Sequence, residues 1–413
     1  MDPVRSLPAN LVAAAVSTAL CLAAAEGGAR LYASRLGGVP HTTRGSIVRY
    51  HPLLGWDKPP GESAWLSRPE YRVFLRVNAG GLRGPDRPHA KAPGSHRTLL
   101  LGDSFVEGYT VAEEASLSAV LERRLQEAGC GTHEVLNAGV MGYSTDQEYL
   151  FYVSEGRRYR PDVVVLLFFY NDLYHNTSAD QGKPYFDLEE GRLVLRNSPV
   201  PAPRDGGTVR RPEPRTLRLE PWRGSMALRL LSERSSANPR LHRALALWGV
   251  VEPPRTEELS PDLWPVALGR RREVEAMWRR TEAILSALDA EVRKDGARLL
   301  LFYVPEHSEV DEAVWEATRR KSRLGRRAPG FEKVHRRFQD AAQRLGIPMV
   351  APHAALRAAE ARGSSGYFRH DGHWNEIGHA IAADGVARFL RAEGWAGCAG
   401  PPAGQSAALA ETP

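Results

Sequence analysis

The sequence predicts an α/β protein built around a doubly wound parallel sheet, and three observations support this fold class. From residue 98 onward, short apolar segments alternate with amphipathic helical patterns. One apolar segment, residues 163–170, is unbroken, as expected of a strand buried on both faces of a parallel sheet. No heptad pattern or fixed-period repeat is visible, which excludes coiled coils and solenoids.

The elements of this sheet can be placed in chain order from their periodicity. The expected strands are residues 98–101, 135–136, 163–170, 298–304 and 347–350. The expected helices are residues 117–125, 145–159, 274–292 and 377–390, the first of them ended by Gly129. This βαβ order predicts a sheet whose strands are joined by right-handed crossovers.

Length and composition set the domain organisation. A chain of 413 residues can form one large domain with an insertion, or two domains. The expected parts are an N-terminal segment (1–39), an extended β lead-in (40–97), the α/β domain (98–396) with an insertion at 173–265, and a disordered tail (397–413). The net charge of +6 is a mild bias that predicts no nucleic-acid partner.

The insertion has an unusual charge composition. Residues 199–255 carry eleven Arg, no Lys, five acidic residues and nine Pro. A solvated surface is the favoured interpretation, and a contact surface for an anionic polysaccharide is the alternative. The basic residues 319–327 allow the same two interpretations.

The N-terminal segment has the pattern of an export signal. Residues 6–25 carry no charge, and Arg5 and Glu26 flank them. This pattern predicts a signal peptide or an N-terminal membrane anchor, and therefore a location in the periplasm or cell envelope, with the retained anchor slightly favoured. Outside the cytoplasm a disulfide between Cys130 and Cys398 is conceivable, although two unrelated thiols are the favoured reading of these positions.

Polar residues follow the expected strands at their carboxyl ends, where function collects in open α/β sheets. Gly102-Asp103-Ser104 follows the first strand, Gly139 the second and Asn171 the third. Asp371 and His373 follow the fifth strand, directly before the last helix.

Together these residues supply the parts that acyl transfer needs. Ser104 is the candidate nucleophile, His373 the general base and Asp371 the residue that orients the imidazole. The Ser104 and Gly139 backbone N–H groups and the Asn171 side-chain amide are the expected oxyanion-hole donors. Asp103 is expected to form a turn.

These motifs resemble the four conserved blocks of the SGNH (GDSL-type) hydrolase superfamily, from residue 50 to 395 without the insertion. The phrases around Ser104, Gly139 and His373, with Asn78-Ala79-Gly80-Gly81, are similar to a bacterial branch that is often membrane-anchored. The resemblance implies a three-layer αβα, flavodoxin-like fold, ester hydrolysis or acyl transfer, no cofactor or metal, and carbohydrate O-acetyl esters as frequent substrates.

Two positions depart from the family pattern. The usual Asp-x-x-His is shortened to Asp371-Gly372-His373, and the usual Gly two residues before the third-block Asn is Phe169. The shorter spacing bears on the Asp–His geometry, and Phe169 is expected to narrow the pocket near the acyl group. His370 and His379 are the alternative histidines, of which His379 is expected to pack on the last helix.

The predicted function is a serine esterase that hydrolyses acyl esters, O-acetyl groups on a carbohydrate above all, through an acyl-enzyme. The partners expected are an acylated small molecule or glycan and, through the N-terminal segment, a membrane. A polysaccharide O-acetyltransferase with the same triad is one alternative, because the triad alone does not decide whether water or a sugar accepts the acyl group. A non-catalytic glycan-binding protein is the other.

Overall fold

A computed structural model describes residues 7–35, 47–68, 70–177, 182–202, 225, 227–228, 231, 235, 238–248, 250, 259–322, 324, 328 and 330–398. The chain divides into two compact units. The smaller unit comprises Met1–Thr42, Ser67–Pro69 and Glu213–Glu258, and the larger unit comprises Thr43–Leu66, Glu70–Pro212 and Leu259–Pro413. Most of the Arg-rich stretch 203–258 and the tail from 399 lie outside the described residues, so the interpretations of both stay predictions.

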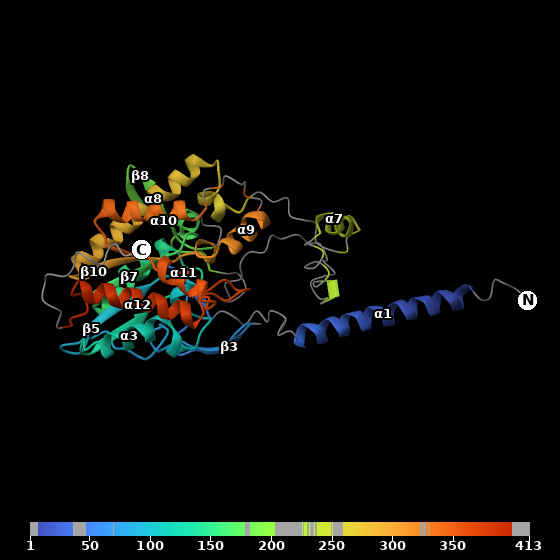
Figure 1. Cartoon of the computed structure of the whole chain (residues 1–413), viewed down its shortest axis with the longest axis horizontal. Helices are drawn as coiled ribbons and strands as arrows, with labels where there is room; N and C mark the ends of the chain where they lie inside the picture. The colour runs from blue at the N-terminus through green and yellow to red at the C-terminus, as the bar shows by residue number, and fades with distance from the viewer. Residues whose placement is uncertain are drawn as a thin grey trace, which may run out of the picture. The chain divides into compact units, whose positions relative to one another are not determined.

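The smaller unit contains two described helices, α1 (Leu7–Arg35) and α7 (Pro239–Leu247), labelled in Figure 1. In α1, Glu26 forms an i,i+4 ion pair with Arg30 and accepts hydrogen bonds from the Ser225 hydroxyl and the Ala227 N–H. α7 begins after Asn238, whose side chain accepts the Leu241 N–H. Among the described helices of the protein, none combines the length and the apolarity needed to cross a membrane.

The larger unit is organised around a five-stranded parallel sheet in the order β11-β10-β7-β5-β6. In chain order its strands are β5 (His96–Leu101), β6 (His133–Asn137), β7 (Val163–Phe168), β10 (Arg298–Tyr303) and β11 (Met349–Val350). Numbered as first to fifth, they lie in the order 2-1-3-4-5, the flavodoxin-like arrangement, which confirms the predicted fold class. The strand order reverses between β5 and β7, so the carboxyl ends of these two strands flank the crevice where ligands bind in such sheets.

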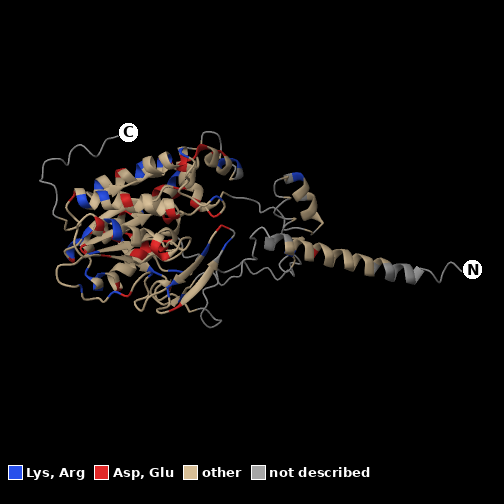
Figure 2. Cartoon of the chain, turned by 60° about the horizontal axis from the view of Figure 1, so that its bottom comes forward, with Lys and Arg blue, Asp and Glu red and all other residues tan. Residues whose placement is uncertain are grey.

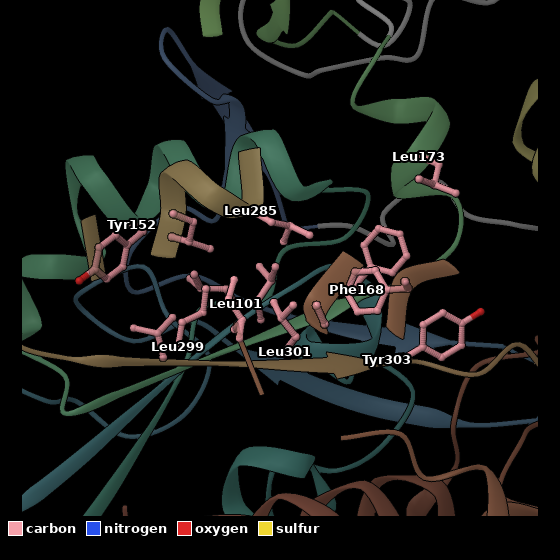
Figure 3. Close-up of a cluster of buried hydrophobic side chains, with 14 of the residues drawn as sticks. Leu101, Tyr152, Phe168, Leu173, Leu285, Leu299, Leu301 and Tyr303 are labelled. Atoms are coloured by element: carbon pink, nitrogen blue, oxygen red, sulfur yellow. The ribbon is translucent and has the colours of Figure 1, made fainter. Parts of the chain in front are cut away.

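Helices cover both faces of this sheet (Figure 1), as the three-layer αβα prediction requires. One face packs on α4 (Thr145–Ser154), α8 (Arg271–Lys294) and α10 (Glu332–Leu345). The other packs on α3 (Leu117–Glu127), α11 (His353–Ala361) and α12 (Glu376–Ala392). Because side chains alternate along a strand, Leu99 and Leu101 point to the first layer and Leu100 to the second. Figure 3 shows the first layer, with Leu285 of α8 among the strand side chains.

The remaining elements are short. Two-stranded sheets are formed by β1 (Arg49–His51) with β2 (Gly55–Asp57), β3 (Ser63–Ser67) with β4 (Arg72–Arg76), and β8 (Tyr185–Glu189) with β9 (Arg192–Arg196). The short helices are α2 (Ser104–Glu107), α5 (Asp172–His175) and α9 (Glu312–Lys321), with 3₁₀ turns η2 (Glu113–Ala115), η3 (Gly156–Tyr159), η5 (Pro261–Val266) and η6 (His307–Glu309). Sheets β1–β2 and β3–β4 form the predicted lead-in region, and β8–β9 opens the insertion.

Two predicted element bounds need correction, and one helix was missed. The helix expected at 145–159 ends at Ser154, and the chain continues as the 3₁₀ turn η3, where Gly156 packs closely on Leu99. The strand expected at 163–170 ends at Phe168, and its last two residues turn into the loop beyond the sheet. Helix α10 was not predicted, although Val334, Phe338, Ala341 and Ala342 recur at helical spacing.

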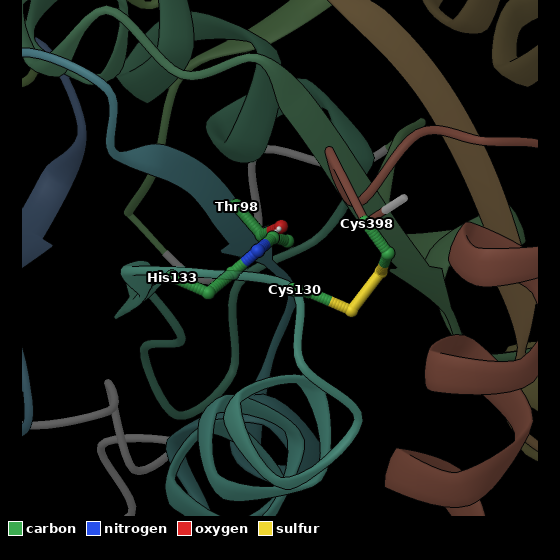
Figure 4. Close-up of a disulfide and its surroundings, with 4 residues drawn as sticks. All are labelled: Thr98, Cys130, His133 and Cys398. Atoms are coloured by element: carbon green, nitrogen blue, oxygen red, sulfur yellow. Dashed lines mark hydrogen bonds between the residues drawn. A yellow bond between two sulfur atoms is a disulfide. The ribbon is translucent and has the colours of Figure 1, made fainter. Parts of the chain in front are cut away.

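The two cysteines that were expected to be unrelated form a disulfide between Cys130 and Cys398 (Figure 4). Cys130 follows α3 and Cys398 follows α12, and these two helices pack against each other on one face of the sheet. The fold therefore brings together two thiols that are separated by 268 positions of sequence.

Charged residues of both signs are interspersed over the helices of the larger unit (Figure 2). Many form ion pairs, such as Arg157 with Glu291 at 2.7 Å and with Asp295 at 2.8 Å.

Candidate active site

The candidate nucleophile Ser104 lies at the start of α2, directly beyond the carboxyl end of β5. The turn into α2 is tight, because a Cβ at Gly102 would collide with the Val106 side chain. The helix is capped by Asp103, whose Oδ1 accepts the Phe105 N–H at 2.9 Å, as expected for a turn-forming residue. The Ser104 hydroxyl is therefore not needed as a helix cap.

Ser104 and His373 are in direct contact. The Ser104 Oγ lies 2.8 Å from His373 Nε2, and His373 Nδ1 lies 2.6 Å from Asp371 Oδ1. These two contacts form a continuous Ser–His–Asp relay, although only one residue separates Asp371 from His373 in the sequence. Gly372 between the acid and the base has a φ of 80°, a left-handed conformation that glycine adopts without strain. The turn at Gly372 lets residues only two apart place their side chains together.

Two tyrosines that the sequence analysis missed hold the acid of this relay. Tyr71 at the start of β4 donates to Asp371 Oδ2 at 2.9 Å, and Tyr109 after α2 donates to Asp371 Oδ1 at 3.3 Å. Tyr109 also lies 3.1 Å from His373 Nδ1. A signal was present, because Tyr71, Val73 and Leu75 alternate on the buried face of β4 and only Tyr71 carries a polar group.

The backbone at Asp371 is held by Glu70, which like Tyr71 belongs to the lead-in. Glu70 accepts the N–H groups of His370 and Asp371 through one carboxylate oxygen, at 2.9 Å each. His370 itself is exposed, whereas His379 is buried in α12 and accepts the Leu117 N–H through Nδ1 at 3.3 Å. In the hydrogen bonds of the described residues, neither His370 nor His379 contacts Ser104. His379 is packed within the last helix, as expected.

The electrostatics keep the acid ionised. Burial opposes ionisation of Asp371, but hydrogen bonds from His373, Tyr71 and Tyr109 outweigh it and lower the pKa of Asp371 below its ordinary value. Burial and the Asp371 charge raise the pKa of Tyr109, so its hydroxyl stays a donor. Asp103 behaves oppositely: burial raises its pKa to about 6.

Ser104, Gly139 and Asn171, the expected oxyanion-hole residues, follow three adjacent strands of the sheet, and the last two differ in their hydrogen bonds. Asn171 precedes α5 after β7, its side chain makes no capping hydrogen bond, and its Oδ1 is buried without a partner. Gly139 packs so closely on α2 that a Cβ would collide with the backbone of Glu107. The Gly139 N–H already donates to the Asn137 side chain at 3.1 Å, so it would have to share or exchange this bond to reach an oxyanion.

Behind the nucleophile lies a group of buried carboxyls that sequence patterns did not indicate. Burial, reinforced by neighbouring acids, raises the pKa of Asp172 and Glu148 well above ordinary values. Asp146 is different, because the fully buried Lys183 ammonium donates to its Oδ1 at 2.6 Å. Lys183 precedes β8, so this ion pair ties the start of the insertion to α4 beside the site.

An aromatic wall lies next to the base. Phe169 follows β7 and its ring is 4.8 Å from the ring of Phe105, which is itself 4.8 Å from the imidazole of His373. Phe169 is the residue at the position where the resemblance led us to expect glycine. The ring of Phe169 therefore adds bulk close to the catalytic side chains.

Comparison with known proteins gives one family match. Residues 100–381 match the model of the GDSL-like lipase/acylhydrolase family. No curated protein matches the chain. The matched range contains every residue of the Ser–His–Asp relay.

Several solved structures are similar at low identity. An acetyl xylan esterase, AlAXEase, is 13% identical, with a TM-score of 0.37 over 71% of this chain and 99% of that one. A lipase/acylhydrolase from Enterococcus faecalis is 13% identical, with a TM-score of 0.35 and coverages of 71% and 95%. A catalytic mutant of Axe2, an acetylxylan esterase from Geobacillus stearothermophilus, is 13% identical, with a TM-score of 0.36 and coverages of 71% and 94%. Likenesses this distant carry no weight in assigning a substrate.

Proposed function

Because the chain belongs to the GDSL-like lipase/acylhydrolase family and is thus an ester hydrolase of the SGNH type, we propose that it is a serine esterase that removes short acyl groups, acetyl above all, from a carbohydrate. The observation that carries this proposal is the relay from Ser104 Oγ through His373 to Asp371, at 2.8 and 2.6 Å.

In the proposed mechanism His373 Nε2 takes the proton of Ser104 as Oγ attacks the ester carbonyl. The negative charge on the carbonyl oxygen is stabilised by the Ser104 N–H and the Asn171 amide, with Gly139 as the third donor. His373 then returns the proton to the leaving alcohol, and the acyl group stays on Oγ. Water deprotonated by His373 releases the acid and restores the serine. Asp371 stabilises the imidazolium in both steps.

The preference for a short acyl group rests on the aromatic wall. The Phe105 ring lies against His373 and the Phe169 ring packs on Phe105, whereas a glycine at position 169 would leave space for a longer chain. An acetyl group needs little room next to Ser104, whereas each further methylene would have to displace a ring. We therefore expect turnover to fall as the acyl chain lengthens.

The preference for a carbohydrate rests on the family resemblance and on an exposed aromatic surface. Trp65 and Phe74 are 55% and 45% exposed, their rings are 5.3 Å apart, and Arg72 lies 4.6 Å above the Trp65 ring. They line a groove of about 800 Å³ whose lining does not include Ser104, Asp371 or His373, so this groove would hold a part of the glycan other than the ester that is cleaved. Exposed aromatic rings of this kind are typical of interaction sites, and sugar rings are suitable partners for their flat faces.

The proposal is tested with p-nitrophenyl esters from acetyl to octanoyl, using full-length protein. We expect acetyl to be the best substrate and Ser104→Ala and His373→Ala each to lower kcat/KM by roughly a thousandfold or more. Tyr50→Phe, distant from the relay, is the control. Folded protein without Ser104-dependent turnover would contradict the proposal and favour a non-catalytic glycan-binding protein. A burst of one product per enzyme, with turnover restored by an added oligosaccharide, would replace it with the O-acetyltransferase.

We also propose that the protein acts outside the cytoplasm, with the N-terminal segment as an export signal or anchor. The Cys130–Cys398 disulfide supports this location, because disulfides persist in oxidising compartments. Cell fractionation with N-terminal sequencing tests it: an envelope fraction is expected, and a cytoplasmic protein with reduced thiols would contradict it. The proposed contact of the Arg-rich insertion with an anionic polysaccharide is tested by comparing polysaccharide binding with and without residues 199–255, and unchanged binding would contradict it.

A further inference from the structure

A second group of chemically reactive side chains lies beyond the carboxyl end of β10, apart from the Ser–His–Asp relay. His307 belongs to η6, Asp311 caps α9 and Glu360 lies in the last turn of α11. One ligand atom from each of these three residues lies within 4.8 Å of the others. We propose that this cluster, named the His307 site, binds a divalent transition-metal ion such as Zn²⁺.

Two His–Glu pairs join the same two elements, η6 and α11, and they differ in how closely the partners approach. His353 of α11 and Glu309 of η6 are in direct contact at 3.0 Å, and the Tyr303 hydroxyl also donates to Glu309. His307 of η6 and Glu360 of α11 stay 3.9 Å apart. His307 Nε2 and Glu360 Oε2 are both buried without a hydrogen-bond partner. Among the described residues, only His353 Nδ1 of the first pair, on the far side of the ring from Glu309, lacks a partner, whereas in the second pair the unpaired atoms belong to both facing groups and are free to bind a ligand.

The spacing of the cluster is also compatible with a bound ion. Zn²⁺ binds His nitrogen and carboxylate oxygen at about 2.0–2.2 Å, so two ligands of one tetrahedral ion lie roughly 3.4 Å apart. His307 Nε2 and Glu360 Oε1 are 3.9 Å apart, and no two ligand atoms of the cluster are more than 4.8 Å apart. Side-chain adjustments of about 0.5–1.4 Å would therefore bring all three ligands onto one ion. One nitrogen and two carboxylates, completed by water, suit zinc or manganese and are too few oxygen ligands for Ca²⁺.

Two of the candidate ligands, Asp311 and His307, are already oriented by neighbouring groups. Asp311 Oδ1 accepts the N–H groups of Ala313 and Val314, which fixes the carboxylate and leaves Oδ2 for an ion. The His307 ring is stacked on the buried Tyr367, with centroids 4.4 Å apart and an interplanar angle of 9°. Hydrogen bonds to a ligating carboxylate, as at Asp311, are characteristic of metal sites, and the stack restricts rotation of the His307 ring. Two carboxylates and a neutral imidazole would balance the charge of a divalent ion.

The position of the His307 site gives the ion a structural role. It would join η6, the start of α9 and the end of α11 at a point where His307 rests on Tyr367. The Tyr367 hydroxyl donates to the Pro305 carbonyl, and Tyr367 pairs with Trp374, the residue after His373. A bound ion would therefore stiffen the support of the catalytic loop without touching the substrate.

The test is a calorimetric zinc titration of full-length protein, stripped of metal with a chelator and free of any affinity tag. We expect one zinc ion per chain, with Asp311→Asn and Glu360→Gln each weakening binding at least tenfold. Asp311→Asn keeps an oxygen for the α9 cap, and circular dichroism checks that both variants are folded. The control is Glu316→Gln, which removes another carboxylate of α9, one paired with Arg319.

Thermal unfolding gives a second readout that does not depend on esterase activity. One equivalent of zinc is expected to raise the Tm of the wild type and of Glu316→Gln but not of Glu360→Gln. The proposal is overturned if the wild type binds no zinc. It is equally overturned if both ligand variants bind zinc as tightly as the wild type, which would place the ion at other residues.

Discussion

The hydroxyl of Tyr71 donates a 2.9 Å hydrogen bond to Asp371 Oδ2, joining residues 300 positions apart. Tyr71 belongs to the β lead-in, and Asp371 orients the base of the candidate triad. In the same region Glu70 holds the Asp371 N–H. The lead-in thus holds the shortened Asp-x-His turn in place through hydrogen bonds. The esterase activity should therefore depend on a segment that precedes the α/β sheet.

Tyr71→Phe is predicted to lower kcat for acetyl ester hydrolysis by roughly tenfold to a hundredfold, the range for losing a hydrogen bond to a charged group. KM should change little, because the hydroxyl contacts the acid and not the substrate. Steady-state kinetics measure this split. Tyr152→Phe is the matched control, since Tyr152 also donates to a carboxylate, Asp295 Oδ2, at 2.9 Å but far from the triad. Equal effects of the two variants would refute a specific role for Tyr71.

Phe169→Ala is predicted to shift the acyl-chain preference toward longer esters. Removing the ring opens space beside Phe105 and His373, so hydrolysis of hexanoyl relative to acetyl esters should rise at least tenfold. Each methylene accommodated in an apolar pocket contributes about 0.8 kcal/mol. The measurement is the ratio of kcat/KM values along a p-nitrophenyl ester series. Phe74→Ala, which truncates an exposed ring on β4, should leave the ratio unchanged. An unaltered ratio in Phe169→Ala would show that this ring does not limit the acyl pocket.

Cys398→Ala is predicted to lower the free energy of unfolding by about 2–5 kcal/mol, the usual cost of removing a disulfide. The Cys130–Cys398 bond closes a loop that contains nearly the whole α/β domain, which restricts the unfolded chain. Denaturant titration with and without reducing agent measures the effect. Reduction should destabilise the wild type and Cys21→Ala alike, since Cys21 is a free exposed cysteine, and should leave Cys398→Ala unaffected. If reduction has no effect on the wild type, the bond is absent.

Stability is predicted to fall in acid partly because of His379. Burial, followed by the nearby charge of Arg83, lowers the pKa of His379 from 6.5 to about 3. Between these values the unfolded chain binds a proton that the folded chain does not, so stability decreases as the pH falls from 6.5 toward 3. The full effect is on the order of 5 kcal/mol.

His379→Asn keeps an acceptor for the Leu117 N–H but cannot titrate in this range. The comparison is the free energy of unfolding at several pH values from 7 to 4. The wild type should lose clearly more stability than the variant over this interval. Parallel curves would mean that His379 is not held neutral in the folded protein.

Much of this protein was determined by local sequence patterns. Apolar runs such as Val163–Phe168 can only be satisfied between two layers of helices, and parallel strands bring their carboxyl ends to one edge. For this reason the sequence alone predicts that Ser104, Asn171 and His373 lie together at that edge. These apolar runs and the polar residues that follow them can be recognised in the sequence because each pattern involves only neighbouring residues.

Only the tertiary structure decided which distant segments meet. The contact of Tyr71 with Asp371, the ion pair of Lys183 with Asp146 and the Cys130–Cys398 bond all depend on how whole elements pack. Periodicity fixes which face of a strand or helix is buried, but not which neighbour covers it. The same applies to the separation of His307 from Glu360, which is set by the placement of η6 against α11. Long-range packing therefore decided the support of the triad, while short-range patterning had already located its members.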